Sequence, residues 1–381
     1  MREIPTDPVT VSDLMSTEVK RTGLPGRDTR DNGLTPQPPT PGGMVLVTGG
    51  GGYIGCVLTE RLLERGYGVR ILDRLYWGEE PLAPFRDRLD LVVADIRDVP
   101  ATALDGIDAV IHLAGLSNDP TAEYDPEANW QMNAVGTADL GRACVERGIE
   151  RLVFSSSCSL YDGLPPAMYD ETAELMPHGA YAESKRFAEG ELLAQQENGL
   201  CPVILRFGTV YGHSPRMRFD LVVNTFVKDA LLEGRLSLHG GGWMWRPLVD
   251  VRDAADALIC AMEAPAELAR GETFNVLHSN YQIRELAMLV AGSVQLLGRQ
   301  VGLEEVPAPP LTRNYECSNA KLAGRLGFVP CRSVVEAVAD VLSRIDVDDR
   351  AMLTDPRHYN IRWFELMHEV NSRVDRFGSV L

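Results

Sequence analysis

The sequence predicts an α/β protein in which a doubly wound parallel sheet is followed by a smaller C-terminal lobe. The first observation is an apolar run at residues 45–48, typical of a strand buried on both faces, which leads directly into a glycine-rich turn. The second is the repetition of such runs, separated by stretches with helical spacing of apolar residues. The third is the loss of this regularity after Phe207, where glycine- and proline-containing loops begin. The further strands are expected at residues 69–73, 91–98, 109–115, 151–154 and 203–207.

The glycine-rich turn has the pattern of a dinucleotide site. Gly49 permits a tight turn, Gly52 lets the backbone approach a pyrophosphate, and Gly55 lets the following helix pack on the strand. Tyr53 and Ile54 open that helix, whose N-terminal N–H groups and positive dipole end favour phosphate binding. Glycine-rich turns occur in many other loops, so the interpretation depends on the rest of the chain.

Asp73 ends the second predicted strand, twenty-odd residues after the first glycine of the turn. A carboxylate at this place accepts hydrogen bonds from the adenosine ribose and repels a 2′-phosphate, which favours NAD as the cofactor. The neighbouring Arg74 keeps NADP open. The alternative for Asp73 is a solvent-facing aspartate that merely ends a strand.

Composition excludes several classes of partner. The chain has 381 residues, enough for a large core, and its net charge of −17 argues against a polymeric nucleic acid as partner. Its seven cysteines are scattered without metal-ligand spacing, so we expect a reduced, cytoplasmic protein with no bound metal. No apolar stretch approaches the length that spans a membrane, so we expect no membrane partner.

Composition and periodicity divide the chain into four parts. Residues 1–43 contain no aromatic residue and are rich in Pro, Thr, Asp and Gly, so we expect a mobile N-terminal extension. Residues 44–211 form the predicted dinucleotide-binding (Rossmann) domain. Residues 212–345 form mainly the substrate-binding lobe, in which residues 249–276 return to the Rossmann sheet. Residues 346–381 form a C-terminal extension whose aromatic residues have near-helical spacing, so we expect it to pack a helix onto the body.

Three residues could carry chemistry. Tyr181 and Lys185 are four residues apart at the start of a predicted helix, so they lie one turn apart on one face. A phenol titrates near about 10, but a neighbouring ammonium and a positive nicotinamide ring stabilise the phenolate and lower its pKa. Ser157, after the fifth strand, could donate a hydrogen bond to the substrate oxygen that Tyr181 deprotonates. Each feature alone also fits a structural role, whereas their combination with the glycine turn indicates a catalytic site.

With these residues the chain resembles an extended short-chain dehydrogenase/reductase, specifically the NAD-dependent nucleotide-sugar epimerase/dehydratase family. The resemblance covers about residues 44–345, and its motifs occur in the family order. The matching segments are residues 48–55, 95–98, 112–115, Asn133, 154–161, the Tyr181/Lys185 pair, 206–212 and 245–253.

The resemblance implies a role for individual residues. Ser157, Tyr181 and Lys185 would be the catalytic trio, and Lys185 would also hold the nicotinamide ribose. Arg246 would bind the substrate diphosphate, a role suited to a forked guanidinium, whereas the alternative is a pair with an acid of the core. The cofactor site would further include Asp95 and Ile96 beside the adenine, Leu113, Ala114 and Asn133, and the substrate site Ser117, Ser157, Thr209 and Asn224. Arg216, Arg218 and Arg313 are weaker candidates for binding a substrate phosphate, and the alternative is that they are solvated surface arginines.

The resemblance also implies an assembly. Family members pair through two helices that correspond here to about residues 128–147 and 180–197, so we expect a homodimer.

The chain departs from the family pattern at several positions. Family dehydratases carry an acidic pair directly after the catalytic hydroxyl residue, and this chain has Cys158 and Ser159 there. Elimination of water would therefore lack its usual acid and base. Cys158 could act as an acid/base, although a small buried thiol that fills space is the simpler interpretation. The other departures are Thr209 in place of asparagine, Asp250 in place of histidine, and Asp162 in place of glycine.

The resulting prediction is an NAD-dependent epimerase of a nucleotide-activated sugar. Tyr181 would take the proton from a sugar hydroxyl, a transient keto intermediate would form, and the bound NAD would be recycled. The alternatives are a dehydrogenase, reductase or decarboxylase acting on a nucleotide-sugar, and a non-catalytic NAD-sensing protein on the same fold.

Overall fold

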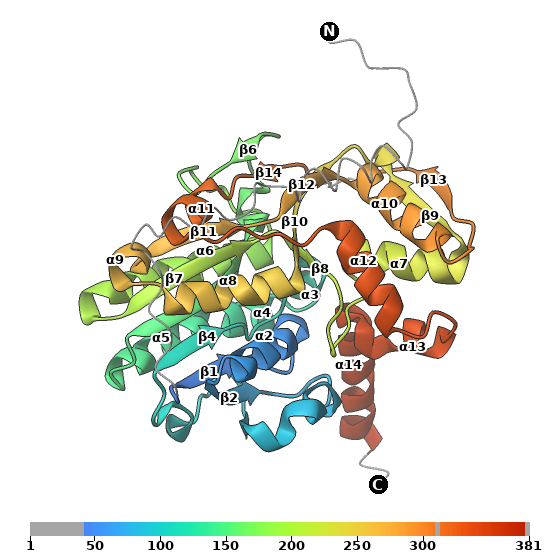
Figure 1. Ribbon diagram of the computed structural model, residues 1–381. Helices are drawn as coiled ribbons and strands as arrows, with labels where there is room; N and C mark the ends of the chain where they lie inside the picture. Colours follow the sequence, from blue (N-terminus) through green and yellow to red (C-terminus); the bar gives the residue numbers. More distant parts are fainter. Residues whose placement is uncertain (1–41, 309–312, 378–381) are drawn as a thin grey trace.

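The computed structural model describes residues 42–308 and 313–377, so all but two residues of the predicted N-terminal extension lie outside the described residues. Its centre is a seven-stranded parallel sheet (Figure 1). Strand β1 lies between β2 and β4, so the chain moves outward to one edge and then crosses back, and ligands bind at such a switch point. The predicted α/β fold is confirmed. In order across the sheet the strands are β11 (Glu272–Val276), β7 (Cys201–Phe207), β5 (Arg151–Ser157), β4 (Ala109–His112), β1 (Met44–Thr48), β2 (Gly68–Asp73) and β3 (Leu89–Val93).

Helices cover both faces of this sheet. Val45 and Val47 of β1 pack with one set of helices and Leu46 with the other, because successive side chains of a strand point to opposite faces. Within the described residues no helix is both long and apolar enough to cross a membrane. One face is covered by α2 (Tyr53–Glu64) and α8 (Val251–Glu263), and the other by α5 (Gly136–Glu146) and α6 (Ala180–Ala194). The shorter helices of this body are α3 (Asp119–Tyr124), α4 (Pro126–Asn129), α9 (Ala266–Ala269) and α11 (Ala320–Leu326), and a π-helical turn spans Trp130–Val135.

The third strand differs from the prediction. We expected it at residues 91–98, whereas β3 spans Leu89–Val93. Asp95 ends the extended conformation, because its carboxylate accepts a hydrogen bond from the backbone N–H of Arg97 at 2.9 Å and so closes a local turn.

A second hydrophobic core builds the C-terminal lobe. Its helices are α7 (Val222–Glu233), α10 (Ile283–Gln295) and α12 (Val334–Arg344), which meet around buried side chains such as Phe226, Leu286 and Val338. Short strands complete the lobe and its junction with the body. They form three small sheets, β12 (Ser279–Gln282) with β10 (Trp245–Asp250) and β8 (Thr209–Tyr211), β13 (Gly302–Val306) with β9 (Arg235–His239), and β14 (Glu316–Cys317) with β6 (Met168–Tyr169). The chain ends with α13 (Arg350–Thr354) and α14 (Asn360–Phe377).

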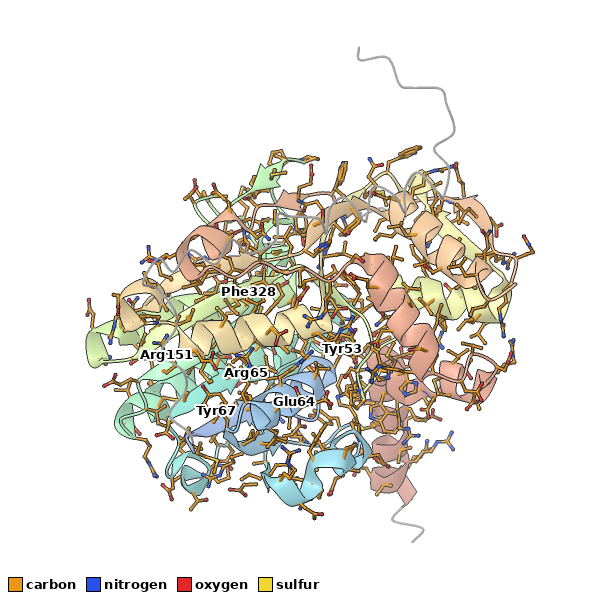
Figure 2. All side chains as sticks on the ribbon, in the orientation of Figure 1. Tyr53, Glu64, Arg65, Tyr67, Arg151 and Phe328 are labelled. Carbon is orange, nitrogen blue, oxygen red and sulfur yellow. The ribbon has the colours of Figure 1, made fainter. Side chains whose placement is uncertain are left out.

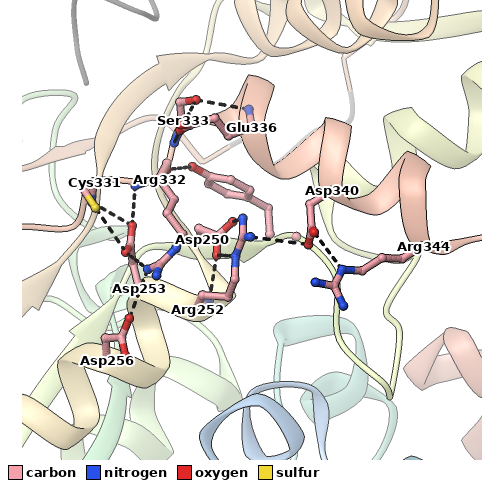
Figure 3. A network of polar contacts seen from close by, with 12 residues as sticks. Asp250, Arg252, Asp253, Asp256, Cys331, Arg332, Ser333, Glu336, Asp340 and Arg344 are labelled. Carbon is pink, nitrogen blue, oxygen red and sulfur yellow. Dashed lines mark hydrogen bonds and ion pairs between the residues drawn. The ribbon is translucent and has the colours of Figure 1, made fainter. Parts of the chain in front are cut away.

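A network of charged side chains joins the lobe to the body (Figure 3). Asp250 caps α8 by accepting a hydrogen bond from the backbone N–H of Arg252, whose guanidinium also pairs with the same carboxylate. Arg252 lies 3.6 Å from Asp340 of α12. Asp253 accepts hydrogen bonds from the backbone N–H groups of Cys331 and Arg332. Asp250, a departure from the family pattern, therefore has a structural role in this chain.

The first turn of α2 also contacts the lobe. Tyr53, which lies at the opposite end of α2 from Tyr67 (Figure 2), donates a hydrogen bond from its hydroxyl to the carbonyl of Gly212 at 2.7 Å. Asn224 of α7 donates a hydrogen bond to the same hydroxyl at 3.1 Å. The helix that follows the glycine turn is thus fixed to both parts of the molecule.

A buried ion pair orients α6 on the sheet. Arg206 of β7 forms a two-pronged pair with Glu189 of α6, with distances of 2.9 and 2.7 Å. Glu189 also accepts a hydrogen bond from Ser156 of β5 at 2.6 Å, and Arg206 donates one to Tyr161 at 2.9 Å. The side chains of the pair are 7% and 1% exposed, so each charge depends on the other.

We predict that Glu189→Ala lowers the free energy of unfolding by about 3 to 5 kcal/mol, because it leaves the guanidinium of Arg206 buried without its counter-charge. The measurement is denaturant unfolding followed by circular dichroism. Glu191→Ala, on the same helix with a half-exposed side chain, is the control and should stay within about 0.5 kcal/mol of the wild type. An equal effect of both substitutions would contradict the prediction.

Candidate active site

A cavity of about 410 Å³ runs along the carboxyl ends of the central strands. The glycine turn, the loop after β4, the serine-rich end of β5 and the start of α6 all line it. Among the described residues, the predicted site residues Asp95, Asn133, Asn224 and Arg246 lie outside this lining. The predicted residues that line the cavity are Gly49, Gly52, Tyr53, Ile54, Gly55, Asp73, Ile96, Leu113, Ala114, Ser117, Ser157, Tyr181, Lys185, Thr209, Arg216 and Arg313.

The glycine turn leaves no room for side chains at two positions. Gly49 has a φ of +75°, and a Cβ there would lie 2.7 Å from the backbone nitrogen of Ala114. A Cβ at Gly55 would lie 2.3 Å from the carbonyl oxygen of Gly49. The start of α2 therefore lies directly against the turn, and the backbone of Gly49, Gly52 and Gly55 lines the cavity, as a bound dinucleotide requires.

Asp73 lines the cavity and also stabilises the glycine turn through hydrogen bonds. Its carboxylate accepts hydrogen bonds from the backbone N–H groups of Gly51 at 2.9 Å and Leu75 at 2.7 Å. Burial raises the pKa of this carboxyl, and the two backbone hydrogen bonds oppose that rise. Asp73 is therefore not a solvent-facing strand end.

Asp95 forms ion pairs with both neighbouring arginines. Arg97 and Arg74 each approach its carboxylate to 2.7 Å. The hydrogen bond from Arg97 is the main reason why the pKa of Asp95 lies below its usual value. Arg74, which had kept NADP open as the cofactor, thus already has a carboxylate partner.

Asn133 does not line the cavity but hydrogen-bonds to the backbone of the loop after β4. Its side chain accepts a hydrogen bond from the backbone N–H of Leu116 and donates one to the carbonyl of the same residue, each at 2.8 Å. It donates a further hydrogen bond to Asn129 at 2.8 Å. Asn133 therefore positions the loop that lines the cavity.

The three predicted catalytic side chains line one part of the cavity. The ammonium of Lys185 donates a hydrogen bond to the carbonyl of Ser155 at 3.0 Å and lies 5.9 Å from the ring centroid of Tyr181. Burial lowers the pKa of Lys185 to about 8, and the nearby Glu189 opposes this shift.

The phenol of Tyr181 is not activated by the chain alone. Burial raises its pKa to about 12, whereas the hydrogen bond with Ser157 and then the charge of Arg218 lower it. The effect of Lys185 on this pKa stays a prediction, and its ammonium lies 5.9 Å from the ring centroid of Tyr181. Among the chain's own groups, Ser157 gives the largest stabilisation of the phenolate.

Several arginines line the cavity. Arg218 forms a two-pronged pair with Asp220 and donates a hydrogen bond to Ser117 at 3.2 Å. Arg313 pairs with Asp119 and lies 3.1 Å from Asp162. The carboxylate at position 162, a departure from the family pattern, therefore has a cation beside it.

Arg246 lies behind Arg313. Its guanidinium donates hydrogen bonds to the carbonyls of Trp245 and Arg313, and no carboxylate in the described part of the chain forms an ion pair with it. Burial lowers the pKa of Arg246. The charge of Asp162 opposes this shift, so an acid influences Arg246 without a direct ion pair.

Asn224 has an internal role. Its amide donates to the carbonyl of Arg218 at 2.9 Å and to the hydroxyl of Tyr53, and its oxygen accepts from the backbone N–H of Gly212 at 3.1 Å. The residue is fully buried. It connects the lobe to α2, and its partners leave no free group for a ligand.

Cys158 and Ser159 do not line the cavity. Both are buried, and the thiol of Cys158 donates a hydrogen bond to the carbonyl of Arg206 at 3.2 Å. The cysteine therefore has the buried, space-filling position that we considered the simpler interpretation.

The sequence did not identify every residue that lines the cavity. Trp77 and Tyr76 follow β2, and Asn360 and Phe364 belong to α14. The only sequence signal for the last two was the near-helical spacing of aromatic residues in the tail, which indicated packing and not a site. Within residues 42–308 and 313–377, no cluster of His, Cys, Asp and Glu side chains could hold a metal ion.

Comparison with known proteins identifies relatives that carry out three different reactions. The chain is 31% identical over 312 residues to a UDP-glucose 4-epimerase of Mycolicibacterium smegmatis, which covers 77% of this chain and 96% of the relative. It is 26% identical over 303 residues to UDP-glucuronic acid decarboxylase 1 of Xenopus tropicalis, covering 75% of this chain and 68% of the relative. The crystal structure of a dTDP-glucose 4,6-dehydratase from Streptomyces venezuelae with NAD bound is similar with a TM-score of 0.71 and 26% identity, covering 82% of this chain and 99% of that chain.

The family model described as NAD dependent epimerase/dehydratase matches residues 45–276. The match covers more than half of the chain, including the glycine turn and the residues that line the cavity from β1 to β7. It confirms the resemblance predicted from the motifs, and with it NAD as the cofactor. The chain belongs to the NAD-dependent epimerase/dehydratase family.

Proposed function

We propose that the protein is an epimerase of a nucleotide-activated sugar. The observation that carries the proposal is that Ser157, Tyr181 and Lys185 line the same cavity as the glycine turn. Relatives of all three reaction types resemble this chain, but the 4-epimerase has the higher identity of the two curated relatives described above and is covered almost in full.

The residues after Ser157 favour epimerisation over elimination of water. A dehydratase needs an acid and a base beside the sugar, and Cys158 and Ser159 at those positions carry no carboxylate and are buried. Epimerisation needs no such pair, because the same phenol can take a proton from a sugar hydroxyl and later return it.

The proton transfer is carried out by Tyr181, with Ser157 and Lys185 beside it. When bound, NAD supplies a nicotinamide ring that accepts and returns a hydride. Tyr181 removes the proton of the sugar hydroxyl, and its hydrogen bond with Ser157 stabilises the phenolate that acts as the base. Lys185, fixed by the carbonyl of Ser155, contributes a positive charge near the ring of Tyr181.

The cationic side chains suit a diphosphate substrate. Arg218 and Arg313 line the cavity, each beside a carboxylate with which a phosphate would compete, and Arg246 donates a hydrogen bond to the carbonyl of Arg313. Guanidinium groups bind phosphate oxygens with two parallel hydrogen bonds, which favours a nucleoside diphosphate over a free sugar.

A homodimer is part of the same proposal. Trp130 and Phe187, on the segments predicted to pair, are 36% and 38% exposed, and their ring centroids lie 5.0 Å apart. Large exposed aromatic side chains of this kind are typical of protein interfaces.

The test is NMR of a panel of UDP-, dTDP-, GDP- and CDP-sugars after incubation with the protein. We expect one of them to be converted to its epimer without release of NADH. Tyr181→Phe should lower the turnover about 10²- to 10⁴-fold while the protein keeps its NAD, because the general base is lost. Tyr124→Phe, which removes the hydroxyl of an exposed tyrosine, is the matched control and should keep full turnover.

Other products would contradict the proposal in distinct ways. Release of carbon dioxide would indicate a decarboxylase, loss of water a dehydratase, and stoichiometric NADH a net dehydrogenase. A Tyr181→Phe protein that retains the wild-type function would indicate an NAD sensor.

A further prediction concerns pH. Ser157→Ala removes the hydrogen bond that lowers the pKa of Tyr181, so that pKa rises further above its ordinary value. Because the base must be deprotonated, the acid limb of the pH–rate profile should move to higher pH. The rate at neutral pH should then fall about tenfold for each unit of that rise.

Ser157→Thr keeps a hydroxyl and should keep the acid limb in place. A loss of rate in Ser157→Ala that is equal at every pH would mean that Ser157 only positions the substrate.

A further inference from the structure

The last helix of the chain closes one end of the cavity. Asn360 and Phe364, both from α14, line the cavity directly. The ring of Phe364 meets those of Tyr76 and Trp77, with centroids 5.4 Å apart in each case, and Trp363 donates a hydrogen bond to the carbonyl of Tyr76 at 2.5 Å. Helix α14 therefore lies against the segment that follows β2.

Asn360 connects this helix to three side chains around the cavity. Its amide oxygen accepts a hydrogen bond from Arg216 at 2.5 Å, and its amide nitrogen donates one to Ser117 at 3.0 Å. Its backbone N–H donates to Asp220 at 3.3 Å. The start of α14 is thus fixed to residues of the loop after β4 and of the segment before α7.

Arg216 is a buried cation without a carboxylate partner in the described part of the chain. It is 3% exposed, its guanidinium lies 3.7 Å from the ring centroid of Trp77, and its Nε has no hydrogen-bond acceptor among the described residues. Two carboxylates whose charges interact with Arg216 are engaged elsewhere, Asp220 by Arg218 and Asp73 by backbone N–H groups. A buried guanidinium with an unused N–H is costly unless an anion binds it.

The position of Arg216 indicates which anion that would be. Its backbone hydrogen-bonds to Cys56 in the first turn of α2, and the hydroxyl of the nearby Ser214 donates to the carbonyl of Tyr53 at 2.7 Å. Its side chain stacks on Trp77, just beyond the end of β2. Arg216 therefore lies between the helix N-terminus after the glycine turn and the strand that ends in Asp73.

We propose that Arg216 is a ligand for a phosphate group of the dinucleotide and that Asn360 positions its guanidinium. The contact between Phe364 and Trp77 holds α14 over this end of the cofactor. This assigns Arg216 to the cofactor, whereas the sequence had suggested the substrate. The proposal concerns the binding of NAD and holds whichever reaction the enzyme carries out.

Direct binding measurements on the protein stripped of NAD test the proposal. Arg216→Met keeps a chain of similar length and removes the charge, and it should raise the Kd for NAD and for ADP-ribose about 10- to 100-fold. The Kd for adenosine, which has no phosphate, should change by less than about twofold. An unchanged Kd for NAD would overturn the proposal.

A second variant tests the role of α14 without changing its size. Asn360→Asp provides Arg216 with a carboxylate that competes with the phosphate, so the Kd for NAD should rise about tenfold and NAD should dissociate faster. Unfolding measurements should show a protein at least as stable as the wild type in the absence of NAD. Asn371→Asp, the same substitution at an exposed position of the same helix, is the control and should leave the Kd unchanged.

The two possible sources of phosphate are separated by a parallel measurement. A raised KM for the nucleotide-sugar with an unchanged Kd for NAD would assign Arg216 to the substrate and overturn the proposal. Unchanged values of both would mean that Arg216 is only structural. Because the binding measurements do not require turnover, they remain decisive even if the epimerase proposal fails.

Discussion

The site depends on a close backbone approach between the glycine turn and its neighbours. Gly49 lies against the backbone of Ala114, and Gly55 lies against Gly49, with no space for a Cβ at either position. This approach brings the start of α2 and the loop after β4 to the same edge of the sheet. The remaining parts of the cavity, from β5 to the lobe, are arranged around that fixed point.

The contacts around this edge connect the cofactor side to the substrate side. Tyr53 joins α2 to Gly212 and Asn224, while Asp250 and Arg252 join α8 to α12. The lobe is therefore held against the Rossmann body by hydrogen bonds and ion pairs as well as by apolar contacts. An arrangement of this kind keeps the two halves of a ligand site in register.

Two ionisable groups of the site lack a counter-charge from the chain itself. Burial opposes charge on both Tyr181 and Arg216, because each loses hydration. Ser157 and Asn360 orient these two groups but supply no counter-charge. A positive nicotinamide ring beside the phenol would stabilise the phenolate, and a phosphate beside the guanidinium would supply the counter-charge that the chain does not.

The sequence by itself determined the sheet, the glycine turn, NAD as the cofactor and the family, because these follow from local periodicity and from short motifs. It placed Asp73, Ser157, Tyr181 and Lys185 on elements whose ends meet in the fold. It could not place Asn224 or Arg246, whose neighbours come from distant parts of the chain. Only the tertiary structure brought Asn360 and Phe364 to the cavity. The hydrogen bond between Asn360 and Ser117 joins residues far apart in the chain, and local sequence patterns do not predict such a contact.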